Sequence, residues 1–329
     1  MTQVDLITGF LGSGKTTFLK RYAGWLLDQG QKIGIIENDF GAVNVDMLLL
    51  QDLEARGAVT EMVVGGDLDC YRRRFRTKLI ALGMQGFDRV LIEPSGIYDA
   101  DEFFDVLCDE PLSRWYEIGN VIAVVDAKLE DSLSREADYL LVSQLADAGC
   151  AVLSRVQESV PEDVEHTVAH INRAMETYDC KKRFAAGSGC EGIRVRAKDW
   201  DALTDEDFRM LTGCGYALAD HVRLQVAREN GFGSLYYMNL SMTPELLRET
   251  ARRLLEDPAC GKVFRVKGFV PDGGGWIEIN ANHDGIRTER TAQGQNVVIL
   301  VGEDLKKDAI DRYMRYGQEG QNGDGNHTL

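Results

Sequence analysis

Residues 9–16 read GFLGSGKT, a complete G-x-x-x-x-G-K-[ST] phosphate-binding loop, and this motif constrains the fold more than any other part of the chain. A short apolar segment at residues 4–8 precedes it, and residues 17–28 follow with apolar side chains at helical spacing. A strand, a glycine-rich turn and a helix in this order surround a phosphate group with backbone N–H groups and a helix N-terminus. The chain is therefore expected to bind a nucleoside triphosphate.

The motif also assigns roles to the side chains of the loop. Lys15 is expected to bridge the β- and γ-phosphate oxygens, and the Thr16 hydroxyl is expected to reach a Mg²⁺ ion. The residues of this segment expected to contact the nucleotide are Gly9, Gly12, Ser13, Gly14, Lys15, Thr16 and Thr17.

The first half of the chain alternates short apolar segments with helical ones, which is typical of a doubly wound parallel α/β sheet of the P-loop NTPase type. After about residue 234 the pattern changes to one helix, several alternating strands and a final helix. We therefore predict a nucleotide-binding domain over residues 1–185, an irregular connecting segment over 186–233 and a small C-terminal α+β domain over 234–316. The Gly/Asn/Gln-rich tail at 317–329 is expected to be disordered.

Composition limits the partners and the compartment. The net charge of −16 argues against nucleic acid and an anionic membrane as partners, because both attract basic surfaces. No apolar run is long enough to span a bilayer, and the chain enters its first strand too early for a signal peptide. Seven scattered cysteines without a C-x-x-C pair suit a reducing compartment, so a cytoplasmic protein is expected.

Two further segments carry candidate catalytic residues. Glu93 ends an apolar strand and is followed by Pro-Ser-Gly. Its carboxylate is therefore expected to bind the Mg²⁺ ion, and the Gly96 N–H is expected to donate to the γ-phosphate. Asp39 follows the second strand, where a switch segment would sense that ion. Lys15, Glu93 and Asp39 are thus the catalytic candidates; a strand-ending turn and an acidic surface turn are the alternatives for the latter two.

The order of the motifs GFLGSGKTT (9–17), ENDFGAVNVD (37–46), EPSG (93–96) and VVDA (124–127) resembles the CobW family of P-loop GTPases. RVKGF (265–269), Trp276 and VILVG (298–302) resemble the C-terminal domain of that family. The resemblance covers residues 3–157 and 234–315. It implies a Mg²⁺-dependent GTPase that acts in delivery or insertion of a metal or metallocofactor, with a client metalloprotein and a second copy of the chain as partners.

The chain departs from the family pattern at the metal motif. The family carries G-C-x-C-C, whereas residues 66–70 read GDLDC. Asp67, Asp69 and Cys70, with Glu37, form a candidate mixed oxygen–sulfur site for Zn²⁺ or Co²⁺, harder in character than a thiolate site. Alternatively, Asp69 caps the following helix, and the arginines at 72–76 neutralise the aspartates.

A second departure affects the base. GTPases of this kind read guanine with N-K-x-D, and the matching residues 154–157 read SRVQ. Ser154, Arg155 and Gln157 are candidate base contacts: Arg155 could stack on a purine, but Gln157 offers one neutral acceptor in place of a carboxylate. GTP and ATP both stay open as the nucleotide.

Two other classes of function fit the same loop. A nucleotide-binding regulatory switch with little hydrolysis is favoured by the altered base segment. An ATP-using phosphotransferase would need a lid, for which the YRRRFRTK run at 71–78 is the candidate. His166 and His170, four residues apart on an expected helix, could share a metal ion, although a solvated helix face is the commoner use of that spacing.

Overall fold

A computed structural model describes residues 1–10, 12–39, 45–64, 68–94, 101–130, 133–186, 192–219, 221–222, 232–283, 285–291 and 294–319. The chain divides into two compact units, the first built from Met1–Phe40 and Leu49–Gln225 and the second mainly from Val226–Leu329. Among the described residues, none of the helices is both long and apolar enough to cross a bilayer.

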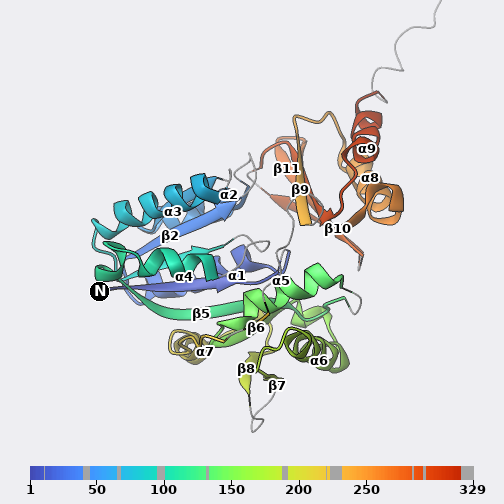
Figure 1. Ribbon diagram of the computed structural model, residues 1–329. Helices are drawn as coiled ribbons and strands as arrows, with labels where there is room; N and C mark the ends of the chain where they lie inside the picture. The colour runs from blue at the N-terminus through green and yellow to red at the C-terminus, as the bar shows by residue number, and fades with distance from the viewer. Residues whose placement is uncertain are drawn as a thin grey trace, which may run out of the picture. The chain divides into compact units, whose positions relative to one another are not determined.

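The first unit is a parallel sheet. Within its described residues, eight strands lie in the order β3-β2-β4-β1-β5-β6-β8-β7, and all their pairings are parallel. The strands are β1 (Thr2–Thr8), β2 (Ile33–Asp39), β3 (Val59–Val64), β4 (Arg89–Glu93), β5 (Tyr116–Asp126), β6 (Cys150–Ser154), β7 (Phe184–Ala186) and β8 (Ile193–Arg196). Figure 1 shows the labelled strands β2, β5, β6 and β8 succeeding one another across the unit. The predicted doubly wound α/β sheet is confirmed.

Helices connect the strands: α1 (Lys15–Asp28), α2 (Val45–Ala55), α3 (Leu68–Gly83), α4 (Asp101–Cys108), α5 (Arg135–Ala146), α6 (Pro161–Thr177) and α7 (Asp205–Leu211). The core between the sheet and α1 contains Ile7, Phe18, Ile35 and Val124, among others. Leu6, whose side chain points to the opposite face of β1, is also fully buried. Both faces of the sheet are therefore covered, as the near-continuous apolar strands predict.

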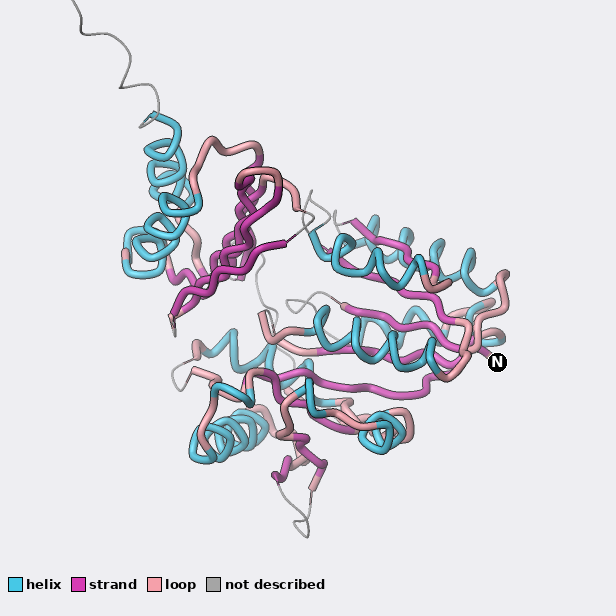
Figure 2. The backbone as a smooth tube through the Cα atoms, turned by 180° about the vertical axis from the view of Figure 1, so that it is seen from behind, coloured by secondary structure: helices cyan, strands magenta, loops and turns pink. Residues whose placement is uncertain are grey.

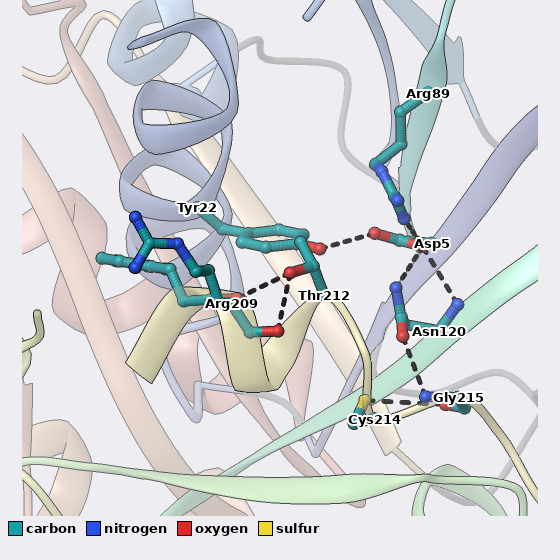
Figure 3. Close-up of polar contacts among 9 residues, drawn as sticks. Asp5, Tyr22, Arg89, Asn120, Arg209, Thr212, Cys214 and Gly215 are labelled. Carbon is teal, nitrogen blue, oxygen red and sulfur yellow. Dashed lines mark hydrogen bonds and ion pairs between the residues drawn. The ribbon is translucent and has the colours of Figure 1, made fainter. Parts of the chain in front are cut away.

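A buried polar cluster joins α1 to the middle of the sheet. The Asp5 carboxylate in β1 is fully buried and accepts hydrogen bonds from the Tyr22 hydroxyl at 2.7 Å and from the Asn120 side-chain amide at 2.9 Å. It is also paired with the Arg89 guanidinium (Figure 3). Burial raises the pKa of Asp5, while Arg89, Tyr22 and Asn120 act in the opposite direction. One carboxylate thus ties together β1, α1, β4 and β5.

The segment after β7 is more regular than the sequence indicates. Residues 186–233 were expected to connect the domains irregularly, but they contain β8, the short 3₁₀ helix η3 (Trp200–Ala202) and α7, all assigned to the first unit. These elements have four, three and seven residues, which is too short for a hydrophobic period to be recognised. Phe208 of α7 packs in the α1 core. The exact domain boundaries stay a prediction.

The N-terminus of α7 yields a pH prediction. Asp207 accepts hydrogen bonds from the Thr204 N–H at 2.8 Å and from the Lys198 ammonium. Desolvation raises the pKa of Asp207, but these two residues outweigh it and lower the pKa to about 2. Because the pKa of Asp207 in the folded state lies below its ordinary value of 3.8, this stabilisation is present above about pH 4 and is lost as the pH falls through about 2. Asp207→Asn should cost about 1 kcal/mol at pH 7, as loss of a cap does.

Urea unfolding of the wild type and Asp207→Asn at a series of pH values measures this directly. The gap between the two midpoints should narrow as the pH is lowered from 4 toward 2. A gap that stays constant with pH would show that the Asp207 charge does not contribute.

The second unit is an antiparallel sheet with two helices. Among its described residues, five strands lie in the order β12-β11-β10-β13-β9. They are β9 (Phe232–Met238), β10 (Lys262–Asp272), β11 (Gly275–Asn282), β12 (Gly285–Thr291) and β13 (Val297–Glu303). The helices α8 (Pro244–Glu256) and α9 (Lys307–Glu319) lie together on one side of this sheet (Figure 2). The predicted α+β fold is confirmed; α9 extends into the expected tail, whose remainder, 320–329, lies outside the described residues.

Candidate functional site

The phosphate loop leaves β1 and enters α1 as the motif predicts. Gly9 has φ 142°, and a Cβ added to it would lie 2.2 Å from the Val124 carbonyl oxygen of β5. Gly14 has φ 96° and precedes the first residue of α1. The backbone path of this loop therefore requires glycine at both positions. Gly12 and the buried Ser13 lie between them, Thr17 is exposed on α1, and residue 11 lies outside the described part of the chain.

Lys15 is folded back over its own loop. It is the first residue of α1, and its side chain is buried, with 6% of the residue exposed. The Lys15 ammonium donates to the Gly9 carbonyl at 3.1 Å. Because this group crosses the loop, it lies where phosphate oxygens held by the loop amides would meet it.

Thr16, the residue after Lys15, contacts a buried carboxylate at the end of β4. The Thr16 hydroxyl donates to the Glu93 carboxylate at 2.9 Å, which joins the first turn of α1 to the carboxyl end of β4. Glu37 is the register partner of Glu93 on the neighbouring strand β2. Both glutamates are buried, with 2% and 7% of Glu37 and Glu93 exposed. The sequence predicts that Thr16 and Glu93 hold one Mg²⁺ ion. The fold adds Glu37, which lies beside Glu93 on the neighbouring strand.

Gln144 of α5 is a loop contact that the sequence analysis missed. Its side-chain oxygen accepts the Gly9 N–H at 3.0 Å, and its backbone carbonyl accepts the Thr8 hydroxyl at 2.7 Å. Only 1% of Gln144 is exposed. The residue lies in a largely buried helix far along the chain, and a glutamine in such a helix carries no signal that it supports the start of the loop.

The predicted base contacts lie at the carboxyl end of β6. Ser154 is buried, and its Cβ lies 3.6 Å from the position that a Cβ on Gly14 would occupy. Arg155 has φ 55° and forms an ion pair with Asp126 at the end of β5. Gln157 is exposed, and its amide donates to the Glu158 carboxylate at 3.3 Å. Ser154 is thus beside the phosphate loop, while Arg155 and Gln157 interact with neighbouring carboxylates.

Several candidate residues fall where the structure makes no statement. Asp67 and Gly96 lie outside the described residues, as do the side chains of Asp39, Asp69 and Cys70. The backbone of Asp39 ends β2, and that of Asp69 lies inside the first turn of α3. Among the described side chains, no cluster of three or more His, Cys, Asp or Glu residues is arranged to hold a metal ion. The mixed oxygen–sulfur site stays a prediction.

The arginines at 72–76 and the histidine pair, two weaker signals in the sequence, include residues that form contacts between elements of the first unit. Arg72 and Arg76 of α3 reach the segment after α4, where they contact the Asp109 carboxylate and the Glu110 carbonyl. His170 is buried, and its ring nitrogen lies 2.7 Å from the Asp138 carboxylate of α5. These contacts hold helices of the first unit together.

Comparison with known proteins gives a consistent picture. The family model described as CobW/HypB/UreG, nucleotide-binding domain, matches residues 3–184. The zinc chaperone YeiR of Escherichia coli (strain K12) is 34% identical over 167 residues, which cover 49% of this chain and 49% of YeiR. The zinc chaperone YjiA of the same organism is 32% identical over 184 residues, covering 53% of this chain and 56% of YjiA. The chain thus spans about half the length of the curated relatives it matches.

Among solved structures, that of the Zn(II)-bound YjiA GTPase from E. coli aligns with 96% of this chain and 98% of its own, at 19% identity and a TM-score of 0.37. So distant a likeness assigns no role to any residue of this chain. The family model, in contrast, covers more than half of the chain and includes the phosphate loop, the β4 glutamate and the strands that carry them. This chain belongs to the CobW/HypB/UreG family.

Proposed function

We propose that this chain is a Mg²⁺-dependent nucleoside triphosphatase, a GTPase by family, that delivers a metal such as Zn²⁺ or Co²⁺ to a client metalloprotein. The observation that carries the proposal is the hydrogen bond between the Thr16 hydroxyl and the Glu93 carboxylate. It brings the end of the phosphate loop, directly after Lys15, and the end of β4 to one place. Phosphate binding and metal binding would therefore share one site.

The residues at this place fit a magnesium ion. Mg²⁺ prefers hydroxyl, carboxylate and phosphate oxygens. Thr16 and Glu93 would hold the ion directly or through water, and the buried carboxylate of Glu37 lies on the adjacent strand. When bound, the ion neutralises charge on the β- and γ-phosphate oxygens.

The reaction is hydrolysis of the terminal anhydride. A water oxygen forms a bond to the γ-phosphorus, the bond from that phosphorus to the β–γ bridging oxygen breaks, and the water releases a proton to solvent. Lys15 would stabilise the charge that grows on the bridging and γ-phosphate oxygens, and the loop amides would hold the β-phosphate. Asp39, at the end of β2, would link a switch segment to the same place.

The proposal that this chain carries a metal rests on its relatives and on its own sequence. Two relatives carry the name zinc chaperone. In this chain the candidate cargo ligands are Glu37, Asp67, Asp69 and Cys70, which offer more oxygen than sulfur. We therefore expect Zn²⁺ or Co²⁺ to be bound reversibly and released to a client, with the second unit as the surface that meets the client. The expected compartment is the cytoplasm, and a homodimer is one of the oligomeric states left open.

Mg²⁺ titration of hydrolysis in Glu93→Gln tests the proposal. The amide keeps an acceptor for Thr16 but removes a negative charge, so the Mg²⁺ concentration for half-maximal phosphate release should rise by about 10- to 100-fold. Glu61→Gln is the matched control, because this glutamate ends no strand and pairs with Lys78 on α3. An unchanged Mg²⁺ midpoint in Glu93→Gln, or phosphate release that persists in EDTA, would contradict the assignment.

The same assay separates the two alternative functions. Tight nucleotide binding without phosphate release would indicate a regulatory switch. Turnover that depends on an added acceptor would indicate a phosphotransferase, but Arg72 and Arg76 of its candidate lid contact the segment after α4. Titrations of GTP and of ATP, each with and without Zn²⁺ or Co²⁺, would address the base and the cargo together.

A further inference from the structure

Trp200 lies against the phosphate loop on the side of β6. A Cβ added to Gly14 would lie 3.2 Å from the Trp200 Cη2 atom and 3.5 Å from its Cζ3 atom. The same position lies 3.6 Å from the Ser154 Cβ. Three segments that are far apart in the sequence therefore meet here: the loop, the end of β6, and η3 after β8. The family resemblance assigned no role to this tryptophan.

The indole is held in place by α1, the helix that the phosphate loop begins. The ring centroids of Trp200 and Phe18 are 5.5 Å apart, at an interplanar angle of 59°. Arg21 donates to the Trp200 carbonyl at 3.3 Å and forms an ion pair with Asp201. Trp200 is thus fixed relative to the loop by packing on both its ring and its backbone.

The indole N–H is an unused donor. The Trp200 Nε1 atom is buried and has no hydrogen-bond partner among the described residues. An indole nitrogen can only donate, and a buried donor without an acceptor costs free energy. Because Trp200 is only partly buried while its Nε1 atom is covered by the protein, a ligand can reach the indole ring but not its N–H.

The strand order shows which part of a nucleotide reaches Trp200. The Thr16–Glu93 contact places the γ-phosphate end over β4, on one side of β1. A triphosphate held on the loop must then extend its nucleoside toward the other side, over β5 and β6. Ser154, Arg155 and Trp200 lie at the ends of β6 and β8 on that side.

We propose that Trp200 forms the base-side wall of the nucleotide site and packs against the purine and ribose of the bound nucleoside triphosphate. This inference rests on the proposed function, because it needs a triphosphate on the loop. Arg155 is paired with Asp126, and Gln157 with Glu158, so the aromatic ring is the contact that every purine shares. Stacking on an aromatic side chain tolerates different bases. Trp200 therefore contributes equally to binding of GTP and ATP.

Calorimetric titration of the full chain with Mg²⁺ and three ligands tests this: GTP, ATP and inorganic tripolyphosphate, which has no nucleoside. Trp200→Leu should weaken GTP and ATP by about tenfold, and tripolyphosphate by less than about twofold. Trp200→Phe keeps an aromatic ring of smaller area, so a loss of about two- to threefold is expected for both nucleotides. Trp25→Leu is the matched control, because it removes a tryptophan of α1 whose ring packs on Phe208 of α7. The two ring centroids are 5.5 Å apart.

Three results would overturn the inference. Unchanged GTP and ATP affinities in Trp200→Leu would show that the ring does not contact the nucleoside. An equal loss for tripolyphosphate would show that Trp200 only supports the loop. If the wild type binds neither nucleotide nor tripolyphosphate, the proposed function itself fails and this inference with it.

Tryptophan emission gives an independent measurement if Trp200→Leu does not fold. Emission of the wild type should change on addition of GTP and should not change on addition of tripolyphosphate. The GTP-dependent change should be lost in Trp200→Phe and kept in Trp25→Phe. A change that survives in Trp200→Phe would contradict the inference.

Discussion

Lys15→Ala is expected to reduce nucleotide hydrolysis by at least about 10²- to 10³-fold, the range seen when one preorganised charge-stabilising group is removed. The Lys15 ammonium is held against the Gly9 carbonyl at 3.1 Å in a buried position, so no other group can move into its place without rebuilding the loop. Phosphate release under saturating GTP and Mg²⁺ measures the loss.

Lys20→Ala is the control for removing a lysine from the same helix. Lys20 lies one turn further along α1 and pairs with the exposed Asp52 at 2.8 Å, away from the loop. We expect Lys20→Ala to hydrolyse GTP like the wild type. Hydrolysis that survives in Lys15→Ala at a rate close to that of Lys20→Ala would remove the basis for an NTPase.

Asp5→Ala is expected to cause the largest loss of stability among single substitutions in the polar core, about 3–5 kcal/mol in the free energy of unfolding. The variant leaves the Arg89 guanidinium without its buried carboxylate and takes the acceptor away from the Tyr22 hydroxyl (Figure 3). Burial and the Asp5 charge raise the pKa of Tyr22, so its hydroxyl stays a donor at neutral pH. Urea unfolding of the first unit measures the change.

Asp52→Ala removes the same charge from an exposed pair. The side chain of Asp52 is 78% exposed, and screening by water makes its ion pair with Lys20 weak. No measurable shift of the urea midpoint is expected. If Asp5→Ala and Asp52→Ala unfold at the same urea concentration, the buried cluster does not stabilise the junction of β1, α1, β4 and β5.

Much of the fold could be predicted from the sequence because its signals are local. Strands β3, β4 and β6 coincide with short runs of mainly apolar residues, and α6 begins at Pro161, a residue type favoured at the first position of a helix. The segment after β7 could not be predicted, because β8 has four residues and α7 seven. Such short elements are stabilised by their tertiary neighbours; Phe208 of α7, for example, packs between Tyr22 and Trp25.

The candidate site shows the same division. Thr16 and Glu93 belong to two recognisable motifs, and the fold joins their side chains by a hydrogen bond. The base contacts stay a prediction: Arg155 is a candidate to stack on a purine, and the structure pairs its guanidinium with Asp126. A charged side chain takes the nearest opposite charge available in the fold, and which charge is nearest depends on strand order.

The sequence by itself determined that the chain carries a phosphate-binding loop between a strand and a helix, because glycines at set positions dictate a backbone path whatever surrounds it. Only the tertiary structure decided what surrounds that loop. Gln144 and Trp200 touch it from residues far along the chain, and Glu37 lies beside Glu93 because β2 and β4 are neighbours. Contacts of this kind depend on strand order and helix packing, which many distant residues set together, so no local pattern can announce them.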